Sequence, residues 1–213
     1  MTLFFCSVLL FCLLLVLLSF LCHLIYRQVL APGAIYYPTP HSTVKKMLDL
    51  AKISPKDTVL DLGSGDGRLL LATARCGATA IGYEIDPRLV RLSRQAIKKA
   101  KLQHLASVKQ QSFWRADFSS ATVITLYLFP QFMNRLQKIL EKKLDHPLTL
   151  VSHNYPFPHK KYIKKTKNLY LYRFGRLVRI RPATAGLETS LLFLRQARQD
   201  SPRHCGVGDR HVT

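Results

Sequence analysis

The stretch "DLGSGDGR", residues Asp61 to Arg68, decides the fold because it joins two apolar runs of different kinds. The run "TVLDL" (58–62) is typical of a short buried strand, and "GRLLLATARCG" (67–77) is typical of a helix. Glycines at alternate positions between them allow positive φ angles and a close approach of the backbone to a ligand. A strand, a glycine-rich turn and a helix in this order predict a nucleotide-type binding loop.

Two common loops of this kind do not match. A dinucleotide-binding loop would carry its third glycine at position 68, where this chain has Arg68. A phosphate-binding P-loop would continue with Gly-Lys-Ser or Gly-Lys-Thr, and neither follows Gly67. The loop therefore predicts a nucleoside ligand of another type.

Strand and helix patterns alternate along the rest of the chain. Strands are expected in "TAIGYE" (79–84), "LASVKQQ" (105–111), "TVITLYLF" (122–129) and "LTLVSH" (148–153), with helices beginning at Pro87 and Pro130. A further helix is expected in "HSTVKKMLDLAK" (41–52), capped by Ser42 or Thr43. The alternation predicts right-handed crossovers and a mostly parallel sheet. Residues 161–180 form two runs around a polar turn, which predicts a terminal antiparallel hairpin at the sheet edge.

The distribution of charge narrows the choice of ligand. The 213-residue chain has a net charge of +20, yet five of its 12 acidic residues fall within 30 positions that hold only two cations. Those five are Asp57, Asp61, Asp66, Glu84 and Asp86. Polyphosphate would be repelled there, whereas a ligand with a sulfonium and an ammonium would be attracted. S-adenosylmethionine is such a ligand.

Each acidic residue has an expected role. Glu84, at the end of the second predicted strand, is placed to accept hydrogen bonds from both ribose hydroxyls. Asp61 is expected near the methionine ammonium, and the helix after Gly67 can face the methionine carboxylate. Asp66 either binds the cofactor or caps that helix, and Asp86 is expected to cap the next one.

With these residues the chain resembles class I methyltransferases of Rossmann-like α/β fold. It is similar in particular to the membrane-anchored protein lysine methyltransferases that include the ATP synthase c-subunit lysine methyltransferases. The resemblance covers roughly residues 35–175. It rests on "YYPTP" (36–40), "DLGSGDGR" (61–68), "GYEIDP" (82–87) and, more weakly, "SFW" (112–114).

The resemblance implies a set of site residues. A loop folded over the cofactor and a glycine loop that binds it would supply Tyr37, Pro38, Thr39, Gly63, Gly65 and Glu84. Ser112 stands where many relatives have an Asp that contacts the adenine amino group. That contact is therefore expected from Ser112 or Phe113, or from Trp114, which fits a core position equally well.

The end of the predicted fourth strand bears on the substrate. Methyltransferases of exocyclic amines commonly carry Asn/Asp-Pro-Pro-Tyr/Phe there, whereas this chain has Leu126-Tyr127-Leu128. The difference favours an aliphatic nucleophile in an apolar tunnel, with Tyr37 and Tyr127 as its walls. A lysine shielded from water beside a sulfonium has a lowered pKa and loses its proton to solvent, so no dedicated base is required. His153 is interpreted as a structural histidine with satisfied hydrogen bonds.

The N-terminus predicts one membrane-spanning helix. The first 26 residues carry no Lys, Arg, Asp or Glu, and as a helix they exceed the ~30 Å of a bilayer core. A cleaved signal peptide is the alternative, but no basic residue precedes the run and no small-x-small site follows it. Arg27, Lys45 and Lys46 come after it and place the rest of the chain on the cytoplasmic or matrix side. The expected location is the inner membrane of a bacterium or a mitochondrial membrane.

Four regions follow from these patterns. Residues 1–27 are the expected anchor, 28–40 a linker and cofactor-covering loop, and 41–181 the methyltransferase domain. Residues 182–213 lack strand or helix periodicity and are expected to be a disordered basic tail.

The leading hypothesis is a membrane-anchored protein lysine methyltransferase. Its substrate would be a membrane-associated protein with an accessible lysine in acidic or apolar surroundings, since a +20 enzyme repels a basic tail. The basic runs "RQAIKKAKLQH" (94–104) and "HKKYIKKTK" (159–167) leave RNA methylation open as an alternative. Methylation of a membrane-soluble small molecule is a third possibility.

Overall fold

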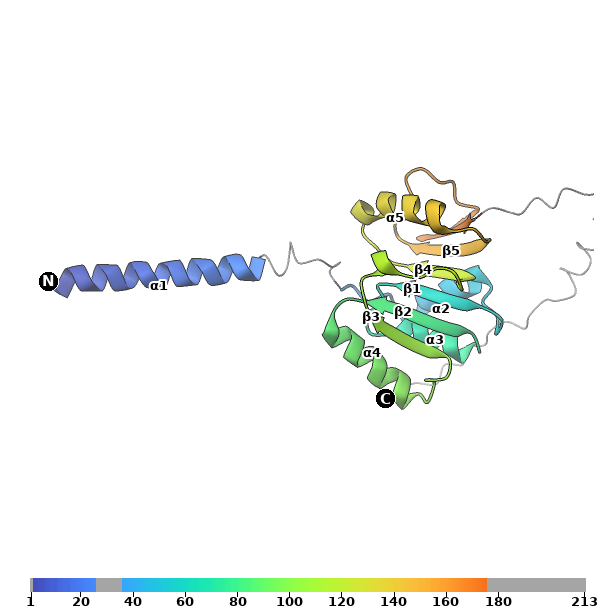
Figure 1. Cartoon of the computed structure of the whole chain (residues 1–213), viewed down its shortest axis with the longest axis horizontal. Helices are drawn as coiled ribbons and strands as arrows, with labels where there is room; N and C mark the ends of the chain where they lie inside the picture. The colour runs from blue at the N-terminus through green and yellow to red at the C-terminus, as the bar shows by residue number, and fades with distance from the viewer. Residues whose placement is uncertain (1, 26–35, 176–213) are drawn as a thin grey trace, which may run out of the picture. The chain divides into compact units, whose positions relative to one another are not determined.

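The computed structural model describes residues 2–25 and 36–175. The chain forms two units, Met1–Tyr36 and Tyr37–Thr213. In the first unit, helix α1 (Thr2–Ile25) contains a stretch, Phe4–Leu24, that is long and apolar enough to cross a membrane (Figure 1). The whole predicted tail and most of the predicted linker lie outside the described residues.

The second unit is built on one seven-stranded sheet with the strand order β3-β2-β1-β4-β5-β7-β6 (Figure 1). The first five strands run parallel, β7 is antiparallel to β5, and β6 is antiparallel to β7. The strands are β1 Thr58–Leu62, β2 Thr79–Glu84, β3 Ala106–Gln110, β4 Val123–Leu126, β5 Leu148–His153, β6 Lys164–Thr166 and β7 Leu169–Phe174. The predicted mostly parallel sheet with a terminal antiparallel hairpin is confirmed.

The helices pack on the sheet through buried apolar residues. They are α2 His41–Ala51, α3 Arg68–Arg75, α4 Pro87–Lys99 and α5 Pro130–Lys143, with a short 3-10 helix, η2, at Phe113–Arg115. Alternate residues of β1 enter different cores, as a strand requires: Val59 packs with α2 and α3, whereas Leu60 packs with α5. Both faces of β1 are therefore buried, which leaves its carboxyl end as the place where polar groups can gather.

Two local predictions need correction. Helix α2 begins at His41, and its N-cap is Pro40, whose carbonyl accepts a hydrogen bond from the Val44 amide; the expected cap at Ser42 or Thr43 is wrong. Strand β4 ends at Leu126, three residues earlier than the apolar run suggested. Because Phe129 caps α5, the chain must leave the sheet before it, and Tyr127 is thereby placed beyond the strand.

Candidate active site

The glycine loop crosses the carboxyl ends of the parallel strands β1 and β2. Gly63, Gly65 and Gly67 have φ angles of 84°, 55° and 82°, in the left-handed region that side chains disfavour. The Gly63 amide donates to the carbonyl of Tyr83 at 2.9 Å, which ties the loop to the end of β2. The predicted need for glycine at these positions is confirmed.

Gly67 also permits a close contact between two helices. A Cβ atom added there would overlap Oγ of Ser93 in α4 and would lie 3.0 Å from its Cβ, which is tighter than most real contacts. Helix α4 can therefore approach the start of α3 only because residue 67 is glycine. No pattern in the sequence points to Ser93 as its neighbour.

Glu84 accepts three hydrogen bonds, one of which comes from the glycine loop. Its Oε2 accepts from the Gly65 amide at 2.9 Å, and its Oε1 accepts from the amides of Ile85 and Asp86 at 2.7 and 2.9 Å. The carboxylate is buried, and these three donors compensate its desolvation. Glu84 therefore clamps the loop to β2 as well as being the residue expected to bind ribose.

Asp61 is a buried carboxyl group that pairs with a hydroxyl. It is 6% exposed, and its Oδ1 accepts a hydrogen bond of 2.9 Å from the Thr125 hydroxyl. Burial raises its pKa to about 7, the Thr125 hydrogen bond opposes the rise, and the neighbouring carboxylates Glu84 and Asp66 add to it. An ammonium group placed here would favour the ionised form, so the site fits the cationic ligand that the sequence predicts.

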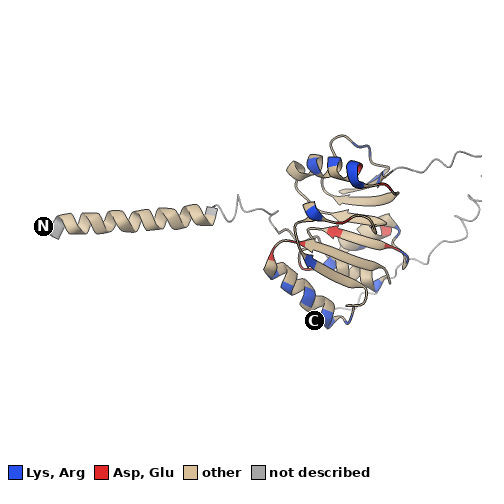
Figure 2. Ribbon diagram, in the orientation of Figure 1, with Lys and Arg blue, Asp and Glu red and all other residues tan. Residues whose placement is uncertain are grey.

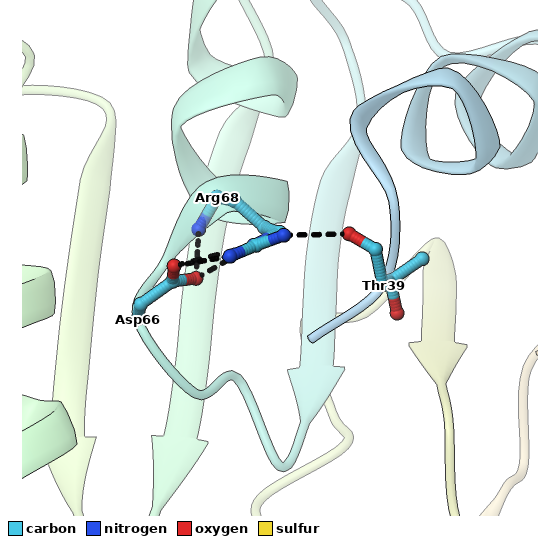
Figure 3. A network of polar contacts seen from close by, with 3 residues as sticks. All are labelled: Thr39, Asp66 and Arg68. Atoms are coloured by element: carbon cyan, nitrogen blue, oxygen red, sulfur yellow. Dashed lines mark hydrogen bonds and ion pairs between the residues drawn. The ribbon is translucent and has the colours of Figure 1, made fainter. Parts of the chain in front are cut away.

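Asp66 and Arg68 connect the glycine loop to the segment before α2 (Figure 3). The Arg68 guanidinium donates through Nη2 to Asp66 Oδ2 at 2.7 Å and through Nε to Asp66 Oδ1 at 3.0 Å. Its Nη1 donates to the carbonyl of Thr39 at 2.9 Å. The Arg68 amide also donates to Asp66 Oδ1 at 3.2 Å, so Asp66 caps the first turn of α3 although Gly67 occupies the N-cap position.

Arg68 is the residue that sequence reasoning misses. In the sequence it stands out only because a glycine is absent there, and no signal links it to Thr39, 29 positions earlier. Asp86, in contrast, accepts from the Arg88 amide and caps α4 as predicted.

The two tyrosines expected to line the substrate tunnel lie together. The rings of Tyr37 and Tyr127 have centroids 6.0 Å apart and are nearly perpendicular. Tyr127 also contacts Tyr155, with ring centroids 6.4 Å apart. The Asn154 side chain donates a hydrogen bond of 2.9 Å to the Tyr127 hydroxyl, which orients the ring from the end of β5. The geometry yields an aromatic wall beside the acidic loop.

His153 supports this wall from β5. Its ring centroid lies 4.1 Å from that of Tyr127, and the residue is 7% exposed. Within the part of the chain that the structure describes, its buried Nδ1 makes no hydrogen bond, so the predicted satisfied histidine is wrong in that respect. Burial lowers the pKa of His153, which keeps the ring neutral near pH 7.

The residues expected near the adenine follow β3 at the same edge of the sheet. The Gln111 amide donates to the Glu84 carbonyl at 2.9 Å, and Ser112 and Phe113 come next in the chain, half-buried. The Trp114 ring packs 4.5 Å from that of Phe113 and lies under the Arg135 guanidinium. Contacts of Ser112, Phe113, Pro38 and Thr39 with the cofactor remain predictions.

Comparisons with known proteins agree with this site. The family described as the ANTKMT methyltransferase domain matches residues 61–164. A protein-lysine N-methyltransferase of Saccharolobus islandicus is 36% identical over 126 residues, which cover 58% of this chain and 78% of that protein. The human lysine N-methyltransferase of the ATP synthase c-subunit is 32% identical over 124 residues, 57% of this chain; the matched region spans about half, 53%, of that protein.

A solved structure extends the likeness to the cofactor. The crystal structure of an RNA methyltransferase from Salinibacter ruber, in complex with S-adenosylhomocysteine, is 38% identical with a TM-score of 0.61. It covers 65% of this chain and 92% of that one. Together with the family match, it confirms S-adenosylmethionine as the cofactor. By its glycine loop, its sheet and these relatives, the chain belongs to the family of S-adenosylmethionine-dependent protein-lysine N-methyltransferases of class I.

Proposed function

We propose that this enzyme methylates a lysine of a membrane-associated protein and that helix α1 anchors it in the membrane. The observation that carries the proposal is the Tyr37–Tyr127 wall directly after β4, whose last residue, Leu126, pairs with Leu62 just before the glycine loop. Aromatic rings can enclose the aliphatic stem of a lysine. Leu126 and Leu128 flank Tyr127 where an amide-binding side chain would be needed for a nucleic-acid base.

Methyl transfer requires the protein chiefly to position the methyl donor and the lysine nitrogen and to exclude water. When bound, S-adenosylmethionine supplies a methyl group on a sulfonium; the new C–N bond forms as the C–S bond breaks, and S-adenosylhomocysteine leaves. Asp61 and Glu84 would hold the ammonium and the ribose, and the tyrosine wall would align the lysine nitrogen. An amine beside the positive charge of the sulfonium has a lowered pKa, so its proton passes to solvent before transfer.

The membrane part rests on α1 and on the relatives. Phe4–Leu24 is 21 residues long, about 31 Å as a helix at ~1.5 Å per residue, which matches a bilayer core of ~30 Å. One relative is named as a lysine N-methyltransferase of the ATP synthase c-subunit. Arg27, Lys45 and Lys46 would keep the enzyme domain on the cytoplasmic or matrix side, where an anchored enzyme meets membrane proteins at raised effective concentration.

A labelling experiment tests the proposal. Membranes that contain the full-length chain are incubated with radiolabelled S-adenosylmethionine, and the label is located by mass spectrometry. We expect methylated lysine in a membrane protein and much less of it with a chain that begins at residue 28. Label found only in RNA or in the lipid extract would contradict the proposal. A C-terminus accessible only from the periplasm or the lumen would contradict the topology.

RNA methylation is the second candidate, because the 38%-identical Salinibacter structure is described as that of an RNA methyltransferase. The exposed lysines at the sheet edge also suit phosphate groups. If RNA is the substrate, its affinity must fall steeply with rising salt, since each contacted phosphate releases counterions. The sequence Leu126-Tyr127-Leu128 favours lysine over a base.

A further inference from the structure

The carboxyl edge of the sheet has charges of opposite sign on its two sides. On the cofactor side, Asp61 and Glu84 lie at the ends of β1 and β2. On the other side, residues 147–175 contain no Asp or Glu, and of their six cations Lys164, Lys165 and Lys167 lie in β6 or in its turn to β7. Lys and Arg are also spread over α4 and α5 (Figure 2), so charge alone does not mark a functional surface. The location of the cations relative to the proposed lysine tunnel is the second criterion.

The turn between β6 and β7 lies at the carboxyl edge. His153, the last residue of β5, pairs with Leu169, and Leu169 pairs with Thr166. The Asn154 amide donates to the Asn168 carbonyl at 2.7 Å, while the Asn154 side chain donates to the Tyr127 hydroxyl. The basic hairpin segment, defined here as residues 160–168, therefore reaches the proposed lysine tunnel at its Asn168 end, whereas Lys160 lies over the Phe174 ring at the other end of β7.

The basic hairpin segment is open to a partner. Residues 161–168 are all exposed, and five of the nine residues in the segment are lysines. In the described part of the chain, ion pairs join Arg68 to Asp66, Arg88 to Asp86 and His146 to Asp145, and none includes a lysine of this segment. Its positive charge is thus uncompensated by the described carboxylates.

Lysines on an edge strand can also be explained without a partner, because their charge discourages edge-to-edge aggregation. That explanation accounts for Lys164 and Lys165 in β6 but not for their neighbours. Tyr162 is 47% exposed and Ile163 is 63% exposed, and apolar side chains on an edge oppose a protective role. Apolar residues framed by cations instead complement a protein segment that carries both apolar and acidic side chains.

We propose that the basic hairpin segment docks the substrate protein and selects a target lysine flanked by acidic and apolar residues. This inference rests on the proposed lysine methylation and specifies its substrate class. Acidic flanks would bind the lysines of the segment, and the target lysine itself would extend past Asn154 towards the Tyr37–Tyr127 wall. Basic flanks would be repelled.

Paired peptides test the inference with the full-length chain in uncharged detergent. Both peptides have one central lysine; one has Asp, Glu and Leu around it, and the other has Arg and Leu. We expect kcat/KM to favour the acidic peptide by about tenfold, in keeping with several rim charges acting together. In Lys164→Glu/Lys165→Glu the preference should disappear or reverse, while the Kd for S-adenosylmethionine stays unchanged.

Lys98→Glu/Lys99→Glu is the matched control, because it makes the same change of charge on α4, which packs against β3 and β2. It should keep the preference of the wild type. If circular dichroism shows that Lys164→Glu/Lys165→Glu does not fold, the milder variant Lys164→Gln/Lys165→Gln should still lower the preference by about threefold.

The outcomes separate the two proposals. Methylation of both peptides at equal rates overturns the docking inference and leaves lysine methylation intact. Binding of S-adenosylmethionine without methylation of any lysine, in peptide or membrane protein, overturns the proposed function. Label transferred to an RNA oligonucleotide, and lost in Lys164→Glu/Lys165→Glu, would assign the surface to RNA and overturn the inference.

Discussion

The guanidinium of Arg68 donates a hydrogen bond of 2.9 Å to the backbone carbonyl of Thr39. Arg68 is also paired with Asp66, in the glycine loop, and Thr39 lies two residues after Tyr37. One side chain therefore joins the glycine loop to the segment that supplies a wall of the proposed substrate tunnel. Any displacement of the glycine loop would be transmitted to Tyr37 through this contact.

Arg68→Ala should weaken cofactor binding and turnover together. It removes a partly buried ion pair and a charged hydrogen bond, which corresponds to about a tenfold rise in the Kd for S-adenosylmethionine. Arg68→Lys should recover only part of the loss, because an ammonium cannot span both partners as the planar fork does. Titration calorimetry gives the Kd, and hydrogen exchange of residues 37–41 reports whether the segment has loosened.

Arg88→Ala is the control for that experiment. Arg88 pairs with Asp86 at the same spacing, two positions apart and at the start of a helix, but its side chain is 82% exposed. We expect no change in cofactor affinity or in exchange at residues 37–41. Equal effects of the two substitutions would show that the Thr39 contact has no role of its own.

The pKa of Asp61, about 7, predicts a pH-dependent affinity for S-adenosylmethionine. Below pH 7 the carboxyl is protonated in the free enzyme, and binding of the ammonium must release that proton. As the pH rises, the Kd should therefore fall by up to about tenfold per pH unit between pH 5.5 and 6.5 and level off above 7. Calorimetry in buffers of different ionisation enthalpy measures the released proton directly.

Asp61 also makes the stability of the fold depend on pH, and its raised pKa determines the direction of that dependence. Between the ordinary value of 3.8 and about 7 the folded state holds a proton that the unfolded state has lost. The contribution of Asp61 to stability is therefore fully present below pH 4 and is lost as the pH rises through 7. Asp61→Asn should flatten both pH profiles. Exposed Asp117→Asn should leave them as they are between pH 4 and 7, because hydrogen bonds from Ser119 lower the pKa of Asp117 and keep it ionised there. A flat profile in the wild type would refute the assignment.

Glu84→Gln tests the clamp on the glycine loop. The amide oxygen can still accept from Ile85 and Asp86, but the amide nitrogen would face the Gly65 N–H, donor against donor. Leaving a buried N–H unpaired costs about 1–3 kcal/mol, so unfolding should become easier and cofactor binding should fall by at least tenfold. Hydrogen exchange at Gly65 should rise. Glu141→Gln, at an exposed position of α5, serves as the isosteric control, and unchanged exchange at Gly65 would count against the clamp.

The features that the sequence predicts correctly are those whose cause is local. Glycine at positions 63, 65 and 67 indicates positive φ angles, and Asp86 followed by Pro87 indicates the start of a helix. Both features could therefore be predicted directly. The alternation of strands and helices determines the parallel sheet, because crossovers of that length leave few other topologies. The placement of Asp61 and Glu84 as carboxylates at this edge follows from the same reasoning.

The features that the sequence does not predict depend on contacts between distant segments. Arg68 meets Thr39, and Gly67 meets Ser93, only after the chain has folded. The predicted helix cap is wrong because Ser42 and Thr43 are good caps locally, whereas Pro40 already starts the helix. The ring of His153 is buried against Tyr127, and its Nδ1 has no hydrogen-bond partner among the described residues. Neither fact could be predicted from the residues next to His153 in the sequence.

His153 is expected to act through packing. Its pKa is lowered by burial, and its ring lies against Tyr127, so His153→Phe should keep the contact and most of the turnover. His153→Ala should lower the free energy of unfolding by about 2–4 kcal/mol through the cavity it leaves. A large loss of kcat in His153→Phe, with KM unchanged and the pH profile altered, would instead make the histidine a proton acceptor.

Tyr127 separates the contribution of a ring from that of a hydroxyl. Tyr127→Phe removes the acceptor of the Asn154 hydrogen bond but keeps the aromatic face towards Tyr37. If the ring aligns the lysine, Tyr127→Phe should retain kcat within about threefold, and Tyr127→Ala should lose about 100-fold, the scale of a misplaced nucleophile. The Kd for S-adenosylmethionine should stay constant in both variants, because no cofactor contact is assigned to this side chain. A loss in Tyr127→Phe as large as in Tyr127→Ala would mean that the hydroxyl carries the function and that an apolar tunnel is the wrong description of the substrate wall.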